Sequence, residues 1–365
     1  MSLRGSTGAM QYTKLGCSDI IVSKVCLGSM TWGEQNSLTE GVAQLDVAFK
    51  EYGVNFLDTA EMYPIPTKAT TQGETDRIIG SWLKQQQRDK VIVATKVAGP
   101  GITWLPGRNG QNSRVREADI LPSVDASLKR LGTDYIDLLQ IHWPDRYVPI
   151  FGATAYNRSL ERDAEPFSAQ LEVLARLVKQ GKVRAIGLSN ETPYGVMKFS
   201  ALADQLGLPK FVSLQNSYSL INRVDFDSAM SEVCSPRNEN IGLLPYSPLA
   251  GGILSGKYAL PNSDQVNAKS RLNLFPGYMG RYKQSLAVAA VEKYRVYAAS
   301  IGLTCTELAL AWCYKQGHVA STIIGATTIA QLRENLDAFD AEKMSRIDEA
   351  AIEAIHKECR DPSKI

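Results

Sequence analysis

The sequence predicts an α/β protein whose eight parallel strands close into a (β/α)8 barrel. Short runs rich in apolar and β-branched residues alternate along the chain with longer amphipathic stretches. Each short run is apolar almost throughout, as expected for parallel strands that are covered on both faces. A doubly wound sheet is the rival architecture. The sequence contains no glycine-rich phosphate fingerprint of either common kind, which weakens that rival.

Eight runs are predicted as strands because each is short, apolar and bounded by turn or helix signals. At 365 residues the chain has the length of one such barrel. In chain order the runs are "KVCLGSM", "VNFLDTA", "KVIVATKV", "YIDLLQIHW", "KVRAIGLSN", "FVSLQNSY", "IGLLPYSPL" and "STIIGAT".

Helices are predicted between these strands. The first, "LTEGVAQLDVAFKEYG", has Thr39 as its expected N-cap and ends at Gly53. The helix "ADILPSVDASLKRLG" ends at Gly132, with Lys129 and Arg130 in its last turn, where the helix dipole favours cations. The remaining predicted helices are "SAQLEVLARLVKQGK" ending at Gly181, "TPYGVMKFSALADQLG" ending at Gly207, and "QLRENLDAF".

Two elements lie outside the repeat. The segment "YTKLGCSDIIVS" predicts an N-terminal β-hairpin that closes the bottom of the barrel, and "SRIDEAAIEAIHKEC" predicts an extra C-terminal helix. Residues 1–10 are interpreted as a tag or disordered leader, and 11–365 as a single barrel domain. Long polar loops follow the third, fourth and seventh strands, where such barrels build their sites: Ala98–Arg114, Pro144–Pro166 and Tyr258–Arg281.

Composition excludes several classes of partner. A net charge of +2 gives no reason to expect nucleic acid or an anionic membrane, and no apolar run approaches the roughly 18 residues of a membrane span. The six cysteines form no C-x-x-C pair, so we expect reduced thiols in a reducing compartment. The three histidines have no ligand spacing that would indicate zinc.

Ionisable side chains stand at the ends of the second, third and fourth strands. Asp58, Lys96 and His142 end these strands, and Tyr63 lies on the loop leaving the second. Because a barrel gathers its strand ends at one mouth, we expect the four side chains to converge. A nearby ammonium lowers the pKa of a phenol from about 10, and a buried carboxylate can hold that ammonium. This set suits protonation of a carbonyl oxygen that the histidine orients.

The later strands end in small and polar groups. Ser189, Asn190 and Gln215 have side chains that could hydrogen-bond an amide. Tyr246 could stack on an aromatic cofactor, and the glycine pair beginning at Gly251 permits close approach of the backbone.

Several stretches along the chain, from Gln11 to the C-terminus, resemble the aldo-keto reductase superfamily. They are "LGSMTWGEQ", "NFLDTAEMY", "ATKV", "SLKRLGTDYIDLLQIHWPD", "GKVRAIGLSN", "SLQNSYSLINR", "PYSPLAGGILSGKY" and "GATTIAQLREN". The segments "YPIPTKATTQG" and "HWPDRYVPIFG" resemble one bacterial subgroup and its plant, often plastid-located, relatives. The resemblance implies a TIM barrel that binds NADPH (NADP+) without a Rossmann fold and reduces carbonyl compounds by hydride transfer.

The resemblance also implies a role for each matching position. The catalytic tetrad falls on Asp58, Tyr63, Lys96 and His142, with Tyr63 as general acid in reduction and general base in oxidation. The implied cofactor positions are Ser29, Met30 and Gln35 at the rim beside the nicotinamide; Ser189, Asn190 and Gln215 at its carboxamide; Tyr246 against its ring; Ser247, Pro248, Leu249 and Gly251 in the pyrophosphate loop; Lys257 and Arg271 at phosphate; and Gly325, Thr327, Gln331, Glu334 and Asn335 at the adenosine end.

The chain departs from the family pattern in two places. Many members carry arginine or lysine in the segment that matches "GATTIAQ", which is uncharged here, although Arg333 follows nearby. Extra residues between Tyr63 and "QGETD" alter a loop beside the pocket, which we interpret as a specificity feature.

The leading hypothesis is an NADPH-dependent reductase of aldehydes or ketones. The alternative is a cofactor-binding regulatory protein like the potassium-channel β-subunits, which resemble the chain but carry asparagine in place of His142. A barrel enzyme of another class, such as a lyase, would need metal-ligand carboxylates or a phosphate-only site, and neither pattern is present. We expect a small carbonyl substrate, a monomer or weak homo-oligomer, and a location in the cytoplasm or, after removal of a transit peptide, the plastid stroma.

Overall fold

Eight parallel strands that follow one another in chain order form the centre of the fold. The computed structural model describes residues 9–153, 155–258, 270–275 and 279–364. Each of the eight predicted runs contains one strand, so the predicted order is confirmed. The strands are β3 (Val25–Gly28), β4 (Phe56–Asp58), β5 (Ile92–Val97), β6 (Ile136–Ile141), β7 (Val183–Ser189), β8 (Phe211–Gln215), β9 (Gly242–Leu243) and β10 (Thr322–Ile324).

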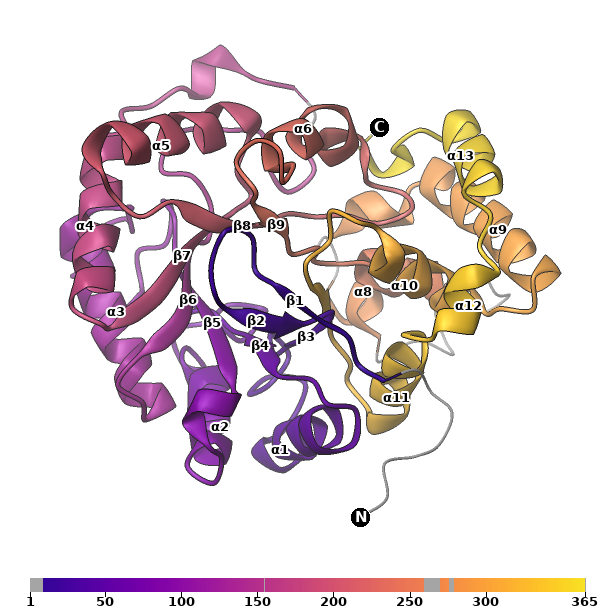
Figure 1. Ribbon diagram of the computed structural model, residues 1–365, viewed down its shortest axis with the longest axis horizontal. Coiled ribbons are helices and arrows are strands. Elements are labelled where there is room, and N and C mark those ends of the chain that lie inside the picture. The colour runs from indigo at the N-terminus through magenta and orange to yellow at the C-terminus, as the bar shows by residue number, and fades with distance from the viewer. Residues whose placement is uncertain (1–8, 154, 259–269, 276–278, 365) are drawn as a thin grey trace.

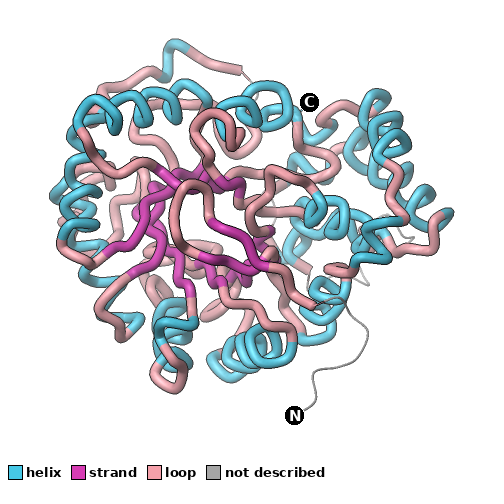
Figure 2. The backbone as a smooth tube through the Cα atoms, in the orientation of Figure 1, coloured by secondary structure: helices cyan, strands magenta, loops and turns pink. Residues whose placement is uncertain are grey.

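The sheet closes on itself. Its strand order is β10-β3-β4-β5-β6-β7-β8-β9, and every neighbouring pair is parallel. The two ends are joined by backbone hydrogen bonds of 2.9 Å, which Ala320 N–H donates to the Leu243 carbonyl and Ile323 N–H donates to that of Pro245. Figure 2 shows the strands enclosed by a ring of helices. This closure confirms the TIM barrel and excludes the open, doubly wound sheet.

Helices cover the outside of the barrel (Figure 1). Gly132 and Gly207 end their helices in the left-handed conformation, as predicted from their positions. In chain order the α-helices of the described residues are α1 (Leu38–Asp46), α2 (Glu74–Leu83), α3 (Glu117–Leu131), α4 (Phe167–Lys179), α5 (Pro193–Leu206), α6 (Ser231–Cys234), α8 (Arg271–Leu274), α9 (Ser285–Ser300), α10 (Cys305–Lys315), α11 (Ile329–Asp337), α12 (Ala341–Ser345) and α13 (Glu349–Glu358).

The predicted start of the first helix was wrong. Ser37, not Thr39, is the N-cap of α1. The Ser37 hydroxyl accepts from the backbone N–H of Glu40 at 3.3 Å, and the Glu40 carboxylate accepts from the Ser37 N–H at 2.7 Å. This reciprocal capping box satisfies two backbone donors at once, which explains why the helix begins at the serine.

The predicted N-terminal hairpin is confirmed, with β1 (Tyr12–Lys14) antiparallel to β2 (Ile21–Ser23). Its Leu15 and Val22 are fully buried in a cluster with barrel residues such as Phe56, so the hairpin closes one end of the barrel (Figure 1). Gly16 has a φ of +56°, and a Cβ there would lie 2.1 Å from the Val212 carbonyl oxygen. Only glycine therefore permits this close approach. The extra C-terminal helix is also confirmed, as α13.

Some predictions fall on residues outside the described ranges. They are residues 1–8 of the expected leader, and residues 259–269 and 276–278 of the long loop after the seventh strand. Within the described ranges, no single helix is long and apolar enough to cross a membrane; α9 and α10 pass that test only as a pair bent by 89°. The described residues also contain no group of three or more His, Cys, Asp and Glu side chains that could hold a metal ion.

Candidate active site

The ammonium of Lys96 joins a carboxylate and a phenol at the barrel mouth. Lys96 is the penultimate residue of β5 and is 1% exposed. Its Nζ lies 2.6 Å from Oδ2 of Asp58 and 3.5 Å from the hydroxyl oxygen of Tyr63, and it donates a 2.8 Å hydrogen bond to the Thr59 carbonyl. Lys96 therefore contacts two of the other three expected catalytic side chains. Burial without bulk water strengthens the attraction within this group.

Asp58 has partners for both carboxylate oxygens. Its Oδ1 accepts hydrogen bonds from Nε2 of Gln140 at 3.2 Å and Nε2 of Gln215 at 2.9 Å. A buried ion pair is retained only when its remaining hydrogen-bonding positions are filled, and these two amides fill them. Gln140 was not predicted from the sequence, although a polar residue inside the apolar strand β6 was a usable signal. Gln215, which was expected to bind the carboxamide of the nicotinamide, donates its side-chain N–H to Asp58.

His142 stands beside Tyr63. The two ring centroids are 5.9 Å apart and the rings meet edge to face. Burial and the Lys96 ammonium hold the pKa of the His142 imidazole well below its usual value. The buried Nδ1 has no hydrogen-bond partner among the described residues. The ring is therefore neutral near physiological pH and can donate a hydrogen bond without carrying charge.

A buried ion pair fixes the loop that carries Tyr63. One Glu61 oxygen accepts from the Ala98 backbone N–H at 2.6 Å, and both of its oxygens lie 3.2 Å from Nη2 of Arg108. The Glu61 backbone N–H in turn donates to the Lys96 carbonyl. These contacts tie the loop after β4 to the end of β5. Neither charged residue was predicted from the sequence, because no local pattern connects two loops that lie so far apart along the chain.

An open cavity of about 1130 Å³ lies above these side chains. Two expected site residues, Lys96 and Gln35, do not line the cavity; Lys96 lies beneath it. The side-chain oxygen Oε1 of Gln35 is buried and has no hydrogen-bond partner among the described residues. The expected site residues that line the cavity are Asp58, Tyr63, His142, Ser29, Met30, Ser189, Asn190, Gln215, Tyr246, Ser247, Pro248, Leu249, Gly251, Lys257, Arg271, Gly325, Thr327, Gln331, Glu334 and Asn335.

Comparison with known proteins matches residues 24–352 to the Aldo/keto reductase family. The chain belongs to the aldo-keto reductase family. It is 41% identical to protein Tas of Escherichia coli K12 over 350 residues, covering 95% of this chain and 98% of Tas. Tas represents the bacterial subgroup expected from the sequence. An aldo-keto reductase of Babesia bovis is 41% identical over 76% of this chain and 99% of its own length. A probable voltage-gated potassium channel subunit beta of Arabidopsis thaliana is 29% identical, covering 91% of this chain and 92% of its own length.

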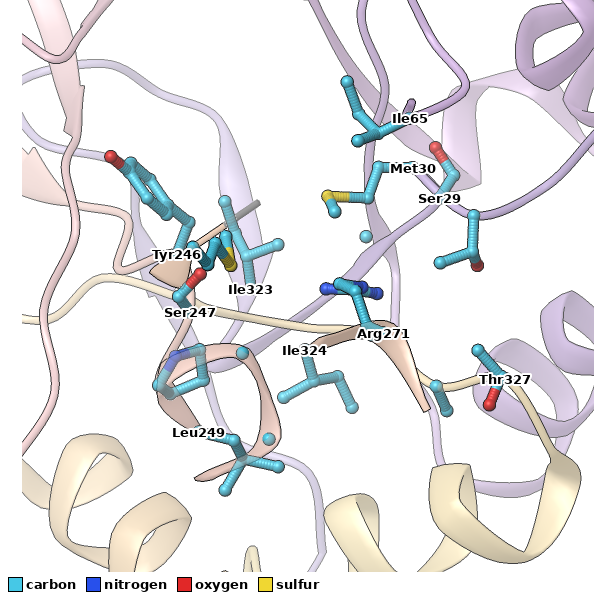
Figure 3. Close-up of a pocket in the computed structure, with 18 of the residues that line it drawn as sticks. Ser29, Met30, Ile65, Tyr246, Ser247, Leu249, Arg271, Ile323, Ile324 and Thr327 are labelled. Atoms are coloured by element: carbon cyan, nitrogen blue, oxygen red, sulfur yellow. The ribbon is translucent and has the colours of Figure 1, made fainter. Parts of the chain in front are cut away.

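In this aldo-keto reductase, two cations mark one part of the cavity. Burial and the neighbouring Arg271 guanidinium lower the pKa of Lys257, while Glu334 acts in the opposite direction. Figure 3 shows the Arg271 side chain in the pocket, between Met30 and Ile324 in this view. Two cations held close together favour binding of an anion such as a phosphate, so the residues here fit the phosphate groups of a dinucleotide.

The backbone beside these cations forms a cradle. Ser247, Ala250, Gly251 and Gly252 all have positive φ, from +46° to +100°. A Cβ on Gly251 would lie 3.2 Å from Sδ of Met279, tighter than an ordinary contact. The turn therefore depends on backbone conformations that favour glycine, and on close packing of Gly251 against Met279.

The start of α11 forms another wall of the cavity. Thr328 caps the helix by accepting from the Gln331 N–H, and Oε1 of Gln331 accepts from the Thr327 N–H at 3.1 Å. Arg333 faces away: it pairs with Glu51 at 2.6 and 2.9 Å and does not line the cavity. Arg333, which follows the uncharged "GATTIAQ" segment in sequence, is therefore paired with a carboxylate outside the cavity.

The polar groups expected at a carboxamide contact one another. The Tyr246 hydroxyl donates to Oδ1 of Asn190 at 2.6 Å, and Nδ2 of Asn190 donates to the His142 carbonyl at 2.8 Å. The backbone of Asn190 has a φ of +54°, which is uncommon for a residue other than glycine. Ser189 donates to the Gln215 carbonyl at 2.8 Å. This group links the end of β7 to the wall that carries Tyr246.

Much of the remaining wall was not predicted from the sequence. The additional lining residues include the apolar and aromatic side chains of Met62, Ile65, Pro66, Trp143, Phe151 and Met279, together with Thr67 and Arg281. Ile65, Pro66 and Thr67 belong to the lengthened loop after β4, which is consistent with its interpretation as a specificity feature. Their positions in long loops gave no periodic signal in the sequence.

We predict that His142 stays neutral in the folded protein well below pH 6.5. Its pKa is lowered, so the unfolded chain binds a proton that the folded chain does not, and this group makes the free energy of unfolding fall as pH drops below about 6.5. Imidazole nitrogen shifts in an NMR titration from about pH 8 to about pH 5 measure the protonation state. A His142→Gln variant assigns the signal. Titration at or above about pH 6.5 would contradict the prediction.

Proposed function

We propose that this aldo-keto reductase uses NADPH to reduce aldehydes or ketones to alcohols, with Tyr63 as the general acid. The observation that carries the proposal is the contact of Lys96 Nζ with both Asp58, at 2.6 Å, and the Tyr63 hydroxyl, at 3.5 Å, beneath an open cavity. NADPH, when bound, supplies the hydride that reaches the carbonyl carbon.

The side chains divide the proton chemistry among them. The Lys96 ammonium stabilises the phenolate of Tyr63, so the phenol gives up its proton more readily to a carbonyl oxygen. Asp58 pairs with that ammonium and offsets the cost of burying it. Neutral His142 donates a hydrogen bond to the same oxygen and orients it. In the oxidation direction, Tyr63 accepts the proton instead.

The cofactor sites follow from the walls of the cavity. Asn190, Ser189 and Gln215 would hold the carboxamide, and Tyr246 would lie against the nicotinamide ring beside Ser29 and Met30. Gln35 is not part of this set, because it does not line the cavity. The turn from Ser247 to Gly251 would approach the pyrophosphate. The remaining groups would hold phosphate and adenosine: Lys257, Arg271, Gly325, Thr327, Gln331, Glu334 and Asn335.

Lys257→Met and Arg271→Met are each expected to weaken NADPH binding by about 10- to 100-fold, because each removes a charge-assisted contact with phosphate. Fluorescence titration of the purified chain with NADPH and with NADH measures the effect and shows which cofactor loses more. Arg333→Met is the matched control, since Arg333 pairs with Glu51 outside the cavity. Equal weakening in the control would show that the phosphate site lies elsewhere.

The second candidate is a cofactor-binding regulatory protein, which the similarity to a probable channel β-subunit supports. The resemblance gives that group an asparagine where this chain has His142, and this difference favours the enzyme. The two functions predict different results with NADPH and an activated aldehyde such as 4-nitrobenzaldehyde. The reductase consumes NADPH over many turnovers, whereas the regulatory protein binds it without sustained loss of absorbance.

A further inference from the structure

The guanidinium of Arg281 lines the cavity and has no role in the chemistry above. Arg281 belongs to the 3₁₀ turn Gly280–Lys283. Its Nη2 donates to the Tyr282 hydroxyl at 3.1 Å, and its guanidinium carbon lies 4.5 Å from the centre of the Tyr282 ring. Tyr282 is fully buried and its hydroxyl lies 3.3 Å from Oγ of Ser217. The arginine is thus held in place by a rigid aromatic support.

No carboxylate among the described residues pairs with Arg281, which sets it apart from the buried and half-buried arginines away from the cavity. A guanidinium has five N–H donors in a planar fork that matches a carboxylate or phosphate. The described arginines that are buried or half-buried away from the cavity each pair with a carboxylate: Arg88 with Asp137, Arg108 with Glu61, Arg114 with Asp145, Arg116 with Asp119, Arg130 with Asp76, Arg146 with Glu191, Arg223 with Asp227 and Arg333 with Glu51.

Arg281 lies on the side of the cavity that leads to His142 and Tyr63. A Cβ on Gly152 would lie 3.1 Å from Cδ of Arg281, so the arginine stem packs against the loop after β6. The neighbouring residue, Phe151, meets Trp143 with ring centroids 6.3 Å apart, and Trp143 meets His142 at 5.0 Å. An aromatic wall therefore runs from the arginine to the proton donors.

We propose that the carbonyl substrate carries an anionic group, a carboxylate or phosphate, that binds Arg281, while its apolar body lies against Trp143 and Phe151. This inference rests on the proposed function. The anion accepts hydrogen bonds from the guanidinium N–H groups that Tyr282 leaves unused. Because Tyr282 already fixes the orientation of the guanidinium, bidentate binding of the anion costs little conformational entropy. The aldehyde or ketone end then faces Tyr63 and His142.

Two aldehydes of nearly equal shape test the proposal. 4-Carboxybenzaldehyde is anionic near neutral pH and 4-nitrobenzaldehyde carries no net charge. Arg281→Met is expected to raise KM for the carboxylate about 10- to 100-fold and to change KM for the nitro compound by less than about twofold. Arg281→Lys should restore part of the difference, because it keeps the charge but loses the fork. Arg237→Met, an exposed arginine away from the cavity, is the control.

Further arms separate the possible outcomes. Glyceraldehyde and glyceraldehyde 3-phosphate, compared in the same variants, show whether phosphate is the preferred anion. An equal rise in KM for charged and uncharged aldehydes, or weaker NADPH binding in Arg281→Met, would overturn the proposal.

Tryptophan fluorescence also measures 4-carboxybenzaldehyde binding to the chain without NADPH. If the native chain turns over no aldehyde, the proposed reduction fails, while loss of this binding in Arg281→Met still supports the anion site.

Discussion

Tyr63→Phe is expected to slow the reduction of 4-nitrobenzaldehyde by about 10²- to 10⁴-fold, the range that a positioned general acid contributes. The substitution removes one oxygen, which lies 3.5 Å from Lys96 Nζ, and keeps the ring that packs edge to face on His142. The cavity wall is therefore preserved while the proton donor is lost. The rate of NADPH consumption in a single turnover is the measurement, because it reports on the chemical step.

Two controls make the Tyr63 result specific. NADPH titrated by fluorescence should bind Tyr63→Phe as tightly as the native chain, because the lost hydroxyl is proposed to act on the substrate. Tyr52→Phe removes a phenol that hydrogen-bonds Asp337 and does not line the cavity, and it should react at the native rate. Native turnover in Tyr63→Phe would show that another group supplies the proton.

The sequence predicted the barrel because its signals are local. Strands such as β5 and β6 are buried at every position, so an apolar run of the right length was enough to identify them. Helix α10 was not predicted, since most of its residues are buried and it lacks the polar face that marks an amphipathic helix. Helix α2 was also not predicted: it starts after Gly73 without a side-chain cap, so the usual start signal is missing.

Site residues could be predicted from the sequence only where they lie at the ends of strands. Asp58, Lys96 and His142 lie at or next to the C-terminal ends of successive strands, and a barrel brings such ends together. The supporting contacts join residues that are far apart in sequence: 47 residues separate Arg108 from Glu61, and 82 separate Gln140 from Asp58. No periodic pattern connects such pairs. They depend on loop conformations, which a single sequence does not define.

Lys96→Met is expected to reduce turnover by about 10²-fold or more and to alter the pH–rate profile, because Tyr63 loses the cation that favours its ionised form. Steady-state rates measured across pH test this role, and a slow variant with an unchanged profile would refute it. The variant also leaves Asp58 buried with only the amides of Gln140 and Gln215 as side-chain partners. An uncompensated buried charge of this kind costs about 3–5 kcal/mol of unfolding free energy.

A double variant separates the loss of stability from the loss of catalysis. Asp58→Asn combined with Lys96→Met removes both buried charges, so its unfolding free energy in urea should exceed that of Lys96→Met alone. Its activity should stay low, since the phenol still lacks an ammonium 3.5 Å away. If activity returns together with stability, Lys96 acts by holding the fold rather than by acidifying Tyr63. If neither returns, the pair is required for the local structure of the barrel mouth, and its roles in stability and in catalysis are not separable.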